Sequence, residues 1–191
     1  QIFRFRQGPP LTIHYVTHHM CHAASAFYCS PFESSAILTV DGYGETCSTQ
    51  IAVGRGLDIT PVMKVEFPHS IGSLYAAVTQ YLGFRPNGGE GKVMGLSSYG
   101  TDSLVDDFRN IVEMTDGGFR IDLSYFSYFL ERPKRFSQRF VDRFGPARTP
   151  GDALTQRHKD MAYALQRVTE EICVHLGNLA RSKTGLNHLS M

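Results

Sequence analysis

The stretch SAILTVDGYG, from Ser35 to Gly44, combines a strand pattern with a turn signal. Residues 35–40 have an apolar centre with β-branched residues, which predicts a strand. The strand runs into Asp41-Gly42-Tyr43-Gly44, and D-G-x-G after a strand is typical of a loop that binds phosphate. Its glycines permit positive φ and let backbone N–H groups approach an anionic oxygen. The D-G pair is also an ordinary turn signal, so the motif alone leaves both interpretations open.

Strand and helix patterns alternate on both sides of this stretch. Apolar and β-branched patterns predict strands at 11–16, 47–53, 57–67, 118–123 and from 186 to the end of the chain. Helical spacing, alanines and capping residues predict helices in the histidine segment up to residue 28 and at 70–82, 102–112, 136–144 and 151–183, with a further short helix after the glycine-rich segment 85–91. The simplest interpretation is one α/β unit, in which helices flank a mixed sheet.

The 191 residues have an ordinary globular composition, with 42% apolar and 19% charged residues. A formal net charge of +1 gives no general electrostatic attraction to nucleic acid or to an anionic membrane. No run approaches the roughly 20 consecutive apolar residues that a membrane-spanning helix needs. The four cysteines form no C-x-x-C pair, which favours free thiols in a reducing compartment. We therefore expect a cytoplasmic protein without a membrane or nucleic-acid partner.

Both ends of the chain have the character of internal segments. The sequence begins at Gln1 without a methionine, and residues 186–191 have the pattern of the opening of a buried strand. An isolated strand leaves its backbone hydrogen-bonding groups unpaired, so a natural domain seldom stops there. We expect the chain to be a piece of a longer protein.

Three histidines lie within five residues, directly before an alanine-rich run. In a helix, His18 and His22 project from the same face, where two imidazoles can bind one metal ion. His19 points roughly 100° away and cannot join that pair. Asp41 is the natural third ligand because it follows a strand, and two imidazoles with a carboxylate suit iron, manganese or zinc. Structural or solvated histidines are the alternative interpretation.

Four blocks of sequence, in order, carry a family resemblance. They are HHxxHAASAF (18–27) with SPF (30–32), LTVDGxGE (38–45), FPHSIGSLY (67–75) with YLGFxPN (81–87), and GExKVMGLxxYG (89–100). Together these blocks resemble the O-carbamoyltransferases of the NodU/CmcH type. The resemblance is dense over residues 16–100 and looser over the remainder.

The resemblance implies a fold and an activity. Such enzymes resemble Kae1-type members of the actin/hexokinase superfamily (ASKHA, ribonuclease H-like) joined to a YrdC-like domain. Residues 1–191 are then expected to be a fragment of the Kae1-like domain that lacks its N-terminal strands, a later metal-binding aspartate and the YrdC-like domain, and to be inactive alone. The implied reaction uses ATP and carbamoyl phosphate to form a carbamoyl-adenylate. The carbamoyl group then passes to a hydroxyl of a small molecule such as a sugar or an antibiotic.

The resemblance also implies which residues bind the cofactors. His18, His22 and Asp41 fall on the positions that hold a divalent metal, with iron preferred, against nucleotide phosphate. The residues expected to contact the nucleotide are Gly42, Gly44, Glu45, Glu90 and Lys92. For the last two, a surface Glu–Lys pair on a loop is nearly as good an interpretation.

The transfer step needs a group that accepts the proton of the acceptor hydroxyl. His19 or His69 is expected to serve if its ring faces the site. Histidines near a metal more often orient other groups, so both are also interpreted as positioning residues.

Three other functions share part of the pattern. A tRNA threonylcarbamoyl transferase shares the histidine pair and the fold, but the SPF and FPHSIG blocks and the lack of a basic stripe argue against it. A sugar kinase of the same superfamily would hold its metal mainly through carboxylate and water. A non-enzymatic nucleotide-binding module would tolerate loss of His18 and His22.

Overall fold

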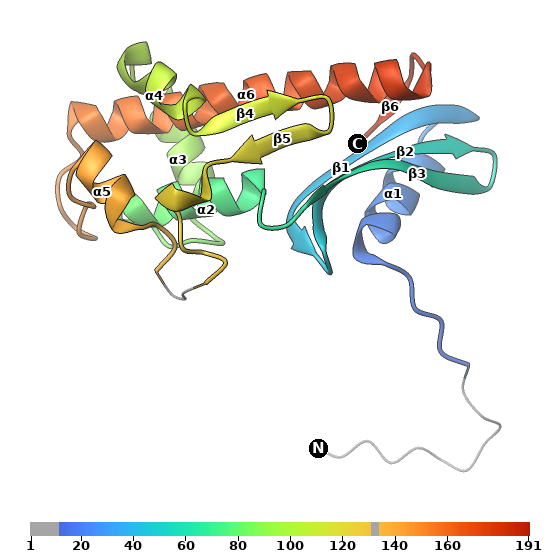
Figure 1. Ribbon diagram of the computed structural model, residues 1–191, viewed down its shortest axis with the longest axis horizontal. Coiled ribbons are helices and arrows are strands. Elements are labelled where there is room, and N and C mark those ends of the chain that lie inside the picture. Colours follow the sequence, from blue (N-terminus) through green and yellow to red (C-terminus); the bar gives the residue numbers. More distant parts are fainter. Residues whose placement is uncertain (1–11, 131–133) are drawn as a thin grey trace, which may run out of the picture.

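The computed structural model of the protein describes residues 12–130 and 134–191. Its main sheet has four strands in the order β3-β2-β1-β6. Strands β1 (Ser34–Gly44), β2 (Cys47–Arg55) and β3 (Asp58–Glu66) form an antiparallel meander, and β6 (Leu189–Ser190) lies parallel to β1. Figure 1 shows this sheet at one end of the molecule and most of the helices at the other, with the long helix α6 (Gln156–Thr184) extending along both.

Successive side chains of a strand point to opposite faces of the sheet, and in β1 and β2 both faces are largely buried, whereas β3 is mostly exposed. On one face, Ile37 and Ala52 pack against Ala23 and Phe27 of helix α1 (His18–Tyr28). The strand residues that join the main core on the opposite face are Ala36, Leu38, Ile51 and Val65. Burial of a side chain such as Phe27 contributes about 1.5–3 kcal/mol, so packing on the sheet stabilises this short helix more than its intrinsic propensity does.

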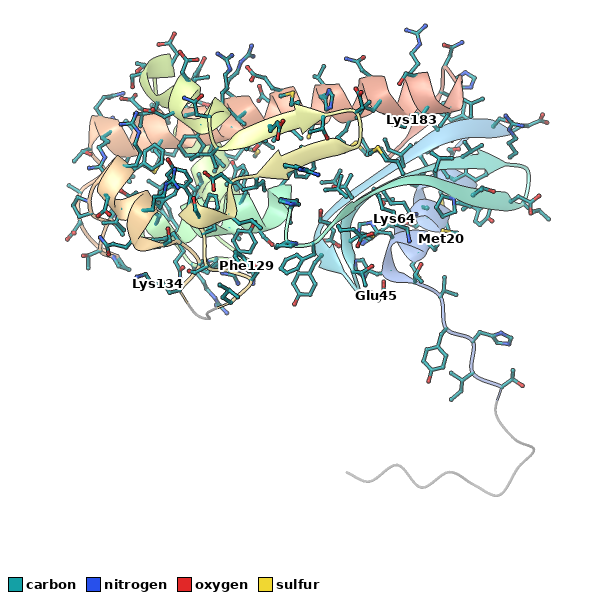
Figure 2. All side chains as sticks on the ribbon, in the orientation of Figure 1. Met20, Glu45, Lys64, Phe129, Lys134 and Lys183 are labelled. Carbon is teal, nitrogen blue, oxygen red and sulfur yellow. The ribbon has the colours of Figure 1, made fainter. Side chains whose placement is uncertain are left out.

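Helices α2 (Ile71–Tyr81) and α6 cover the main-core face of β1. Helix α2 begins after Ser70, whose hydroxyl oxygen accepts the N–H of Ser73, and α6 ends at Gly185, which has a φ of +67°. The predicted apolar stripe of α6 faces the core: Leu165, Val168, Ile172 and Leu176 are buried, and its fifth member, Leu179, is partly buried against the same core. The tip of the β1–β2 hairpin, where Glu45 is labelled in Figure 2, lies beside the beginning of α1.

The remaining elements lie at the helical end of the molecule (Figure 1). They are α3 (Glu90–Ser97), α4 (Val105–Arg109), α5 (Gln138–Phe144), the 3-10 turns η1 (Asp102–Leu104) and η2 (Leu123–Tyr125), and the hairpin of β4 (Val112–Thr115) and β5 (Gly118–Ile121). The described residues thus form a mixed α/β fold with helices on both faces of the sheet. Strand β4 was not predicted, because its four residues directly follow a helical signal.

The predicted strand at residues 11–16 is wrong where the structure describes it. Residue 11 lies outside the described residues, and residues 12–17 pair with no strand. The side chains of Ile13, Tyr15 and Val16 are exposed, and this segment leads away from the body of the molecule (Figure 1). Alternation predicts an extended backbone, but a strand also needs a neighbour to pair its N–H and C=O groups.

Two expectations from composition can be compared with the structure. The four cysteines are free, as predicted. Across the described part of the chain, no helix combines the length and the apolar character that crossing a bilayer requires.

Candidate metal centre

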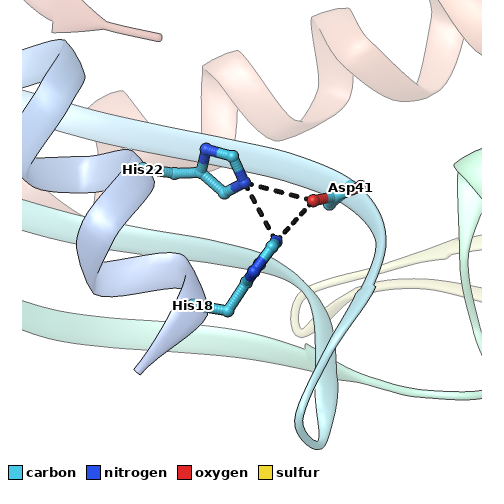
Figure 3. Close-up of side chains that lie close together, drawn as sticks. All are labelled: His18, His22 and Asp41. Atoms are coloured by element: carbon cyan, nitrogen blue, oxygen red, sulfur yellow. Dashed lines mark hydrogen bonds and ion pairs between the residues drawn. The ribbon is translucent and has the colours of Figure 1, made fainter. Parts of the chain in front are cut away.

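Helix α1 and strand β1 bring the three predicted metal ligands together (Figure 3). His18 Nε2 lies 2.6 Å from Asp41 Oδ2, His22 Nε2 lies 3.1 Å from the same oxygen, and the two nitrogens are 3.0 Å apart. Three atoms that all carry lone pairs approach this closely only when protons or a cation lie among them. The side chains are 37–49% exposed, so an ion can enter from solvent and keep open coordination positions.

The three atoms lie 2.6, 3.0 and 3.1 Å apart, which is close enough for one ion to contact all of them. Two imidazoles and one carboxylate on one face of an octahedron are the ligands of many non-haem iron(II) sites. The residues therefore fit a divalent ion such as iron.

A bulge at the end of β1 places Asp41 opposite α1. Three residues of β1, Asp41 to Tyr43, lie opposite Ser48 alone in β2, so the regular pairing is interrupted there. Bulges of this kind turn a side chain out of its regular direction and are common beside active sites. The segment predicted to be a phosphate loop is thus the irregular end of a strand that continues to Gly44.

The Asp41 carboxylate is oriented and ionised. Its Oδ1 accepts the N–H of Gly42 at 2.6 Å, which leaves Oδ2 for the two imidazoles. Ser70 Oγ donates to the carbonyl oxygen of Gly42 at 2.5 Å and ties the start of α2 to the bulge. Burial opposes ionisation, but the hydrogen bonds from His18, Gly42 and His22 together lower the pKa of Asp41. A carboxylate held in this way suits a metal ligand.

His19 faces the interior of the protein and not the metal ligands. Its ring is buried, with Nδ1 2.8 Å from Thr39 Oγ1 and Nε2 3.0 Å from the carbonyl oxygen of Cys47. A carbonyl oxygen can only accept, so Nε2 carries the proton and Nδ1 accepts from the Thr39 hydroxyl. Burial lowers the pKa of His19, against the opposing effect of the bond to Cys47. Contrary to expectation, His19 has no free nitrogen to accept a substrate proton, and it instead fixes the rotation of α1 on the sheet.

Gly44 and Glu45, expected to bind phosphate, contact α1. Both carboxylate oxygens of Glu45 accept the backbone N–H of His18, at 3.0 and 3.1 Å. A Cβ built on Gly44 would lie 2.6 Å from Cβ and Cγ of His18, so a glycine is needed for the ring to lie there. Neither residue lines the two cavities that flank the ligands. The contacts observed for both residues serve His18.

Two cavities flank the ligand cluster. One has a volume of about 500 Å³ and a mainly apolar lining that includes Asp41, Gly42 and Glu90. The other has a volume of about 340 Å³ and is lined in part by His22. Glu90 also accepts the N–H groups of Asn87 and Gly88, each at 2.7 Å, and thereby closes the glycine-rich loop on the start of α3. Asp41 and Glu90 can therefore contact the same ligand.

His69 and Lys92 lie outside these two cavities. His69 lines a separate cavity of about 570 Å³ beside β4 and β5. Its Nδ1 accepts the N–H of Ile121 at 3.1 Å, so the neutral ring carries its proton on Nε2. Burial, followed by the charge of Arg120, lowers the pKa of His69. Contrary to the expectation for a catalytic base, His69 cannot accept a proton without losing the bond to Ile121. Lys92 is exposed on α3.

The sequence profile of one protein family, described as "Carbamoyltransferase N-terminus", matches residues 5–191. The chain belongs to this carbamoyltransferase family.

Relatives of this carbamoyltransferase chain align over nearly all of it. It is 42% identical to an uncharacterized protein of Synechocystis over 96% of its own length. It is 36% identical to the nodulation protein NolNO of Sinorhizobium fredii over 95% of its length, and 34% identical to the nodulation protein NolO of Bradyrhizobium diazoefficiens over 92%. The chain spans 30%, 25% and 30% of these three relatives, respectively.

Several residues that hold the three candidate metal ligands in place were not identified from the sequence. Thr39 fixes the ring of His19, and Ser70 holds the bulge. Gly72 lets α2 approach the bulge, because a Cβ there would lie 2.9 Å from Cα of Gly42. Ser70 and Gly72 both belong to the FPHSIG block, and a serine directly before an apolar helical pattern is a capping signal that could have located the start of α2.

Proposed function

We propose that this chain takes part in transferring a carbamoyl group from carbamoyl phosphate, through an ATP-derived carbamoyl-adenylate, to a hydroxyl of a small molecule. The observation that carries the proposal is the convergence of His18 Nε2, His22 Nε2 and Asp41 Oδ2 within 3.1 Å in a member of the carbamoyltransferase family.

The three converging side chains are the proposed ligands of a divalent ion, with iron as the first choice. When bound, such an ion supplies Lewis-acid stabilisation of the negative charge on a phosphate group. The chain itself orients the ligands. The Gly42 N–H turns the carboxylate of Asp41, and His19 holds α1 so that His18 and His22 face that carboxylate.

The larger flanking cavity is the proposed site of the nucleoside. Its volume of about 500 Å³ and its mainly apolar lining suit a ligand with a flat apolar base, since ligand pockets are commonly of this kind. Glu90 supplies a carboxylate for hydroxyl groups of the sugar, and Asp41 marks the side on which the phosphate lies. Lys92, Gly44 and Glu45 have no part in this assignment.

In the transfer step, the acceptor hydroxyl oxygen forms a bond to the carbamoyl carbon. The bond from that carbon to the adenylate phosphate oxygen breaks, and AMP leaves with the electron pair of that bond. The hydroxyl proton passes to solvent in this scheme, because the nitrogens of His19 that could accept it are already occupied and His69 lies in another cavity.

We further propose that the fold is part of an actin/hexokinase-like domain and that the protein is cytoplasmic. The antiparallel meander followed by a helical connection and a strand parallel to β1 supports the first assignment. The four free cysteines support the second.

The test compares full-length wild-type protein with His22→Ala and with the control His14→Ala, which removes a histidine outside the ligand cluster. Bound metal is measured by mass spectrometry, and completion of the transfer step is followed as AMP released from ATP only when carbamoyl phosphate is present. We expect His22→Ala to lose both metal and AMP release and His14→Ala to keep both. Retention of metal and turnover by His22→Ala would show that the assignment is wrong.

A further inference from the structure

The β1–β2 hairpin has an unusual residue at its tip. Gly44 pairs with Cys47, so the loop consists of Glu45 and Thr46 alone, and Glu45 has a φ of +41°. A two-residue hairpin loop with positive φ at its first position normally has glycine there, because a Cβ strains that conformation. The turn itself therefore does not account for a glutamate at this position.

The contacts of Glu45 supply a reason. Helix α1 has no acidic residue in its first turn, and its N-cap residue Thr17 makes no side-chain capping bond. The first backbone N–H groups of a helix need acceptors and favour a negative charge. Glu45 meets that need from another element, because both of its carboxylate oxygens accept the N–H of His18.

The N–H group that Glu45 holds belongs to a metal ligand. His18 offers its Nε2 to the centre while its backbone is held by Glu45 and its ring packs on Gly44. On the next residue, His19 holds α1 from inside the sheet. His18 is thus fixed from the hairpin tip and from the interior.

We propose that Glu45 is a positioning residue for the metal centre: it accepts a strained turn conformation in order to hold the backbone of His18 and so place Nε2 opposite Asp41. This inference rests on the proposed function, because it requires that His18, His22 and Asp41 bind a metal ion.

The test uses Co²⁺ alone as the probe, with the full-length protein, and records both affinity and the visible absorption bands of the bound ion. Glu45→Gly and Glu45→Asn suit positive φ but cannot reach His18, whereas Glu45→Gln keeps an oxygen that can accept its N–H. Glu66→Ala is the charge-matched control, because the exposed side chain of Glu66 makes no hydrogen bond or ion pair with any described residue. Thermal melting is measured for every variant.

We expect Co²⁺ affinity to fall about tenfold or more in Glu45→Gly and Glu45→Asn, with altered absorption bands, and to stay within about threefold of wild type in Glu45→Gln and Glu66→Ala. Melting temperatures of the glycine and asparagine variants should change little, because a relaxed turn offsets a lost cap. If Glu45 were needed only for the turn, its replacement would change the melting temperature and leave the Co²⁺ affinity unchanged.

The possible failures are distinguishable. If a folded Glu45→Gly or Glu45→Asn protein binds Co²⁺ with wild-type affinity, the positioning role of Glu45 is wrong, whereas the proposed metal centre is unaffected. A loss in Glu45→Gln as large as in the glycine variant also overturns it, because a retained acceptor then fails to rescue. A wild-type protein that binds no Co²⁺ overturns both this inference and the metal centre of the proposed function.

Discussion

Replacing Gly44 with alanine tests whether close packing of the hairpin sets the position of His18. A Cβ at residue 44 would lie 2.6 Å from Cβ and Cγ of the His18 side chain. Carbon atoms in favourable contact are about 3.5–4.0 Å apart, so His18 must retreat by roughly 1 Å or the hairpin must open by that amount.

A displacement of this size is large for a metal ligand. Metal–ligand distances vary by only about 0.2 Å in working sites, so a shift of roughly 1 Å removes Nε2 from the coordination shell unless the helix moves with it. Misplacing a ligand in this way should cost at least about tenfold in metal affinity, which corresponds to about 1.4 kcal/mol.

The assay is calorimetric titration of Co²⁺ into full-length wild-type, Gly44→Ala and Gly42→Ala proteins. Gly42→Ala is the matched control, because a Cβ at Gly42 meets nothing within 4 Å and the residue lies two positions away on the same strand. We expect Gly44→Ala to bind weakly and Gly42→Ala to bind as wild type. Equal affinity in a folded Gly44→Ala protein would refute the packing argument.

Two further predictions concern stability. Burial lowers the pKa of both His69 and His158. Below about pH 6.5, these two histidines therefore bind more protons in the unfolded chain than in the folded one. Their contribution to the free energy of unfolding is complete above that pH and is lost as the pH falls. The urea midpoint should therefore be lower at pH 5.5 than at pH 7.5. His158→Gln keeps a helix-capping side chain that does not titrate, so the difference between the two midpoints should be smaller in this variant. The same difference in wild type and variant would contradict this account. Leu165→Ala should lower the free energy of unfolding by about 2–5 kcal/mol, because Leu165 is fully buried in α6. Leu57→Ala is the control: its side chain is 88% exposed, so the free energy of unfolding should change by less than about 0.5 kcal/mol. Equal urea midpoints for the two variants would argue against the core assignment.

Local patterns in the sequence predicted most of the helices and strands and the three residues of the candidate metal centre. His18 and His22 share a helix face by spacing alone, and the strand before Asp41 has an apolar centre with β-branched residues. Each of these patterns depends on residues within a few positions of one another. They could be predicted without knowledge of tertiary contacts, and the structure has all three side chains in contact.

Other assignments failed because they depend on which surface a side chain meets after folding. The ring of His19 lies between Thr39 and Cys47, and nothing near it in the sequence shows that both nitrogens will be occupied. His69 belongs to a block that also contains Ser70, yet the two side chains face different parts of the molecule. The D-G-x-G motif has the letters of a phosphate loop, but Asp41 to Tyr43 form a bulge within β1, and pairing with β2 resumes at Gly44.

The proposed metal ligands lie close together in the sequence, since His18 and Asp41 are only 23 positions apart. Closing a loop of this length costs little conformational entropy compared with joining distant parts of a chain. The segment from α1 to β2, which holds the proposed ligands and most of their supports, is synthesised before any of the helices α2 to α6. The proposed ligand set is therefore complete in the chain before the helices that cover the main-core face of the sheet are made.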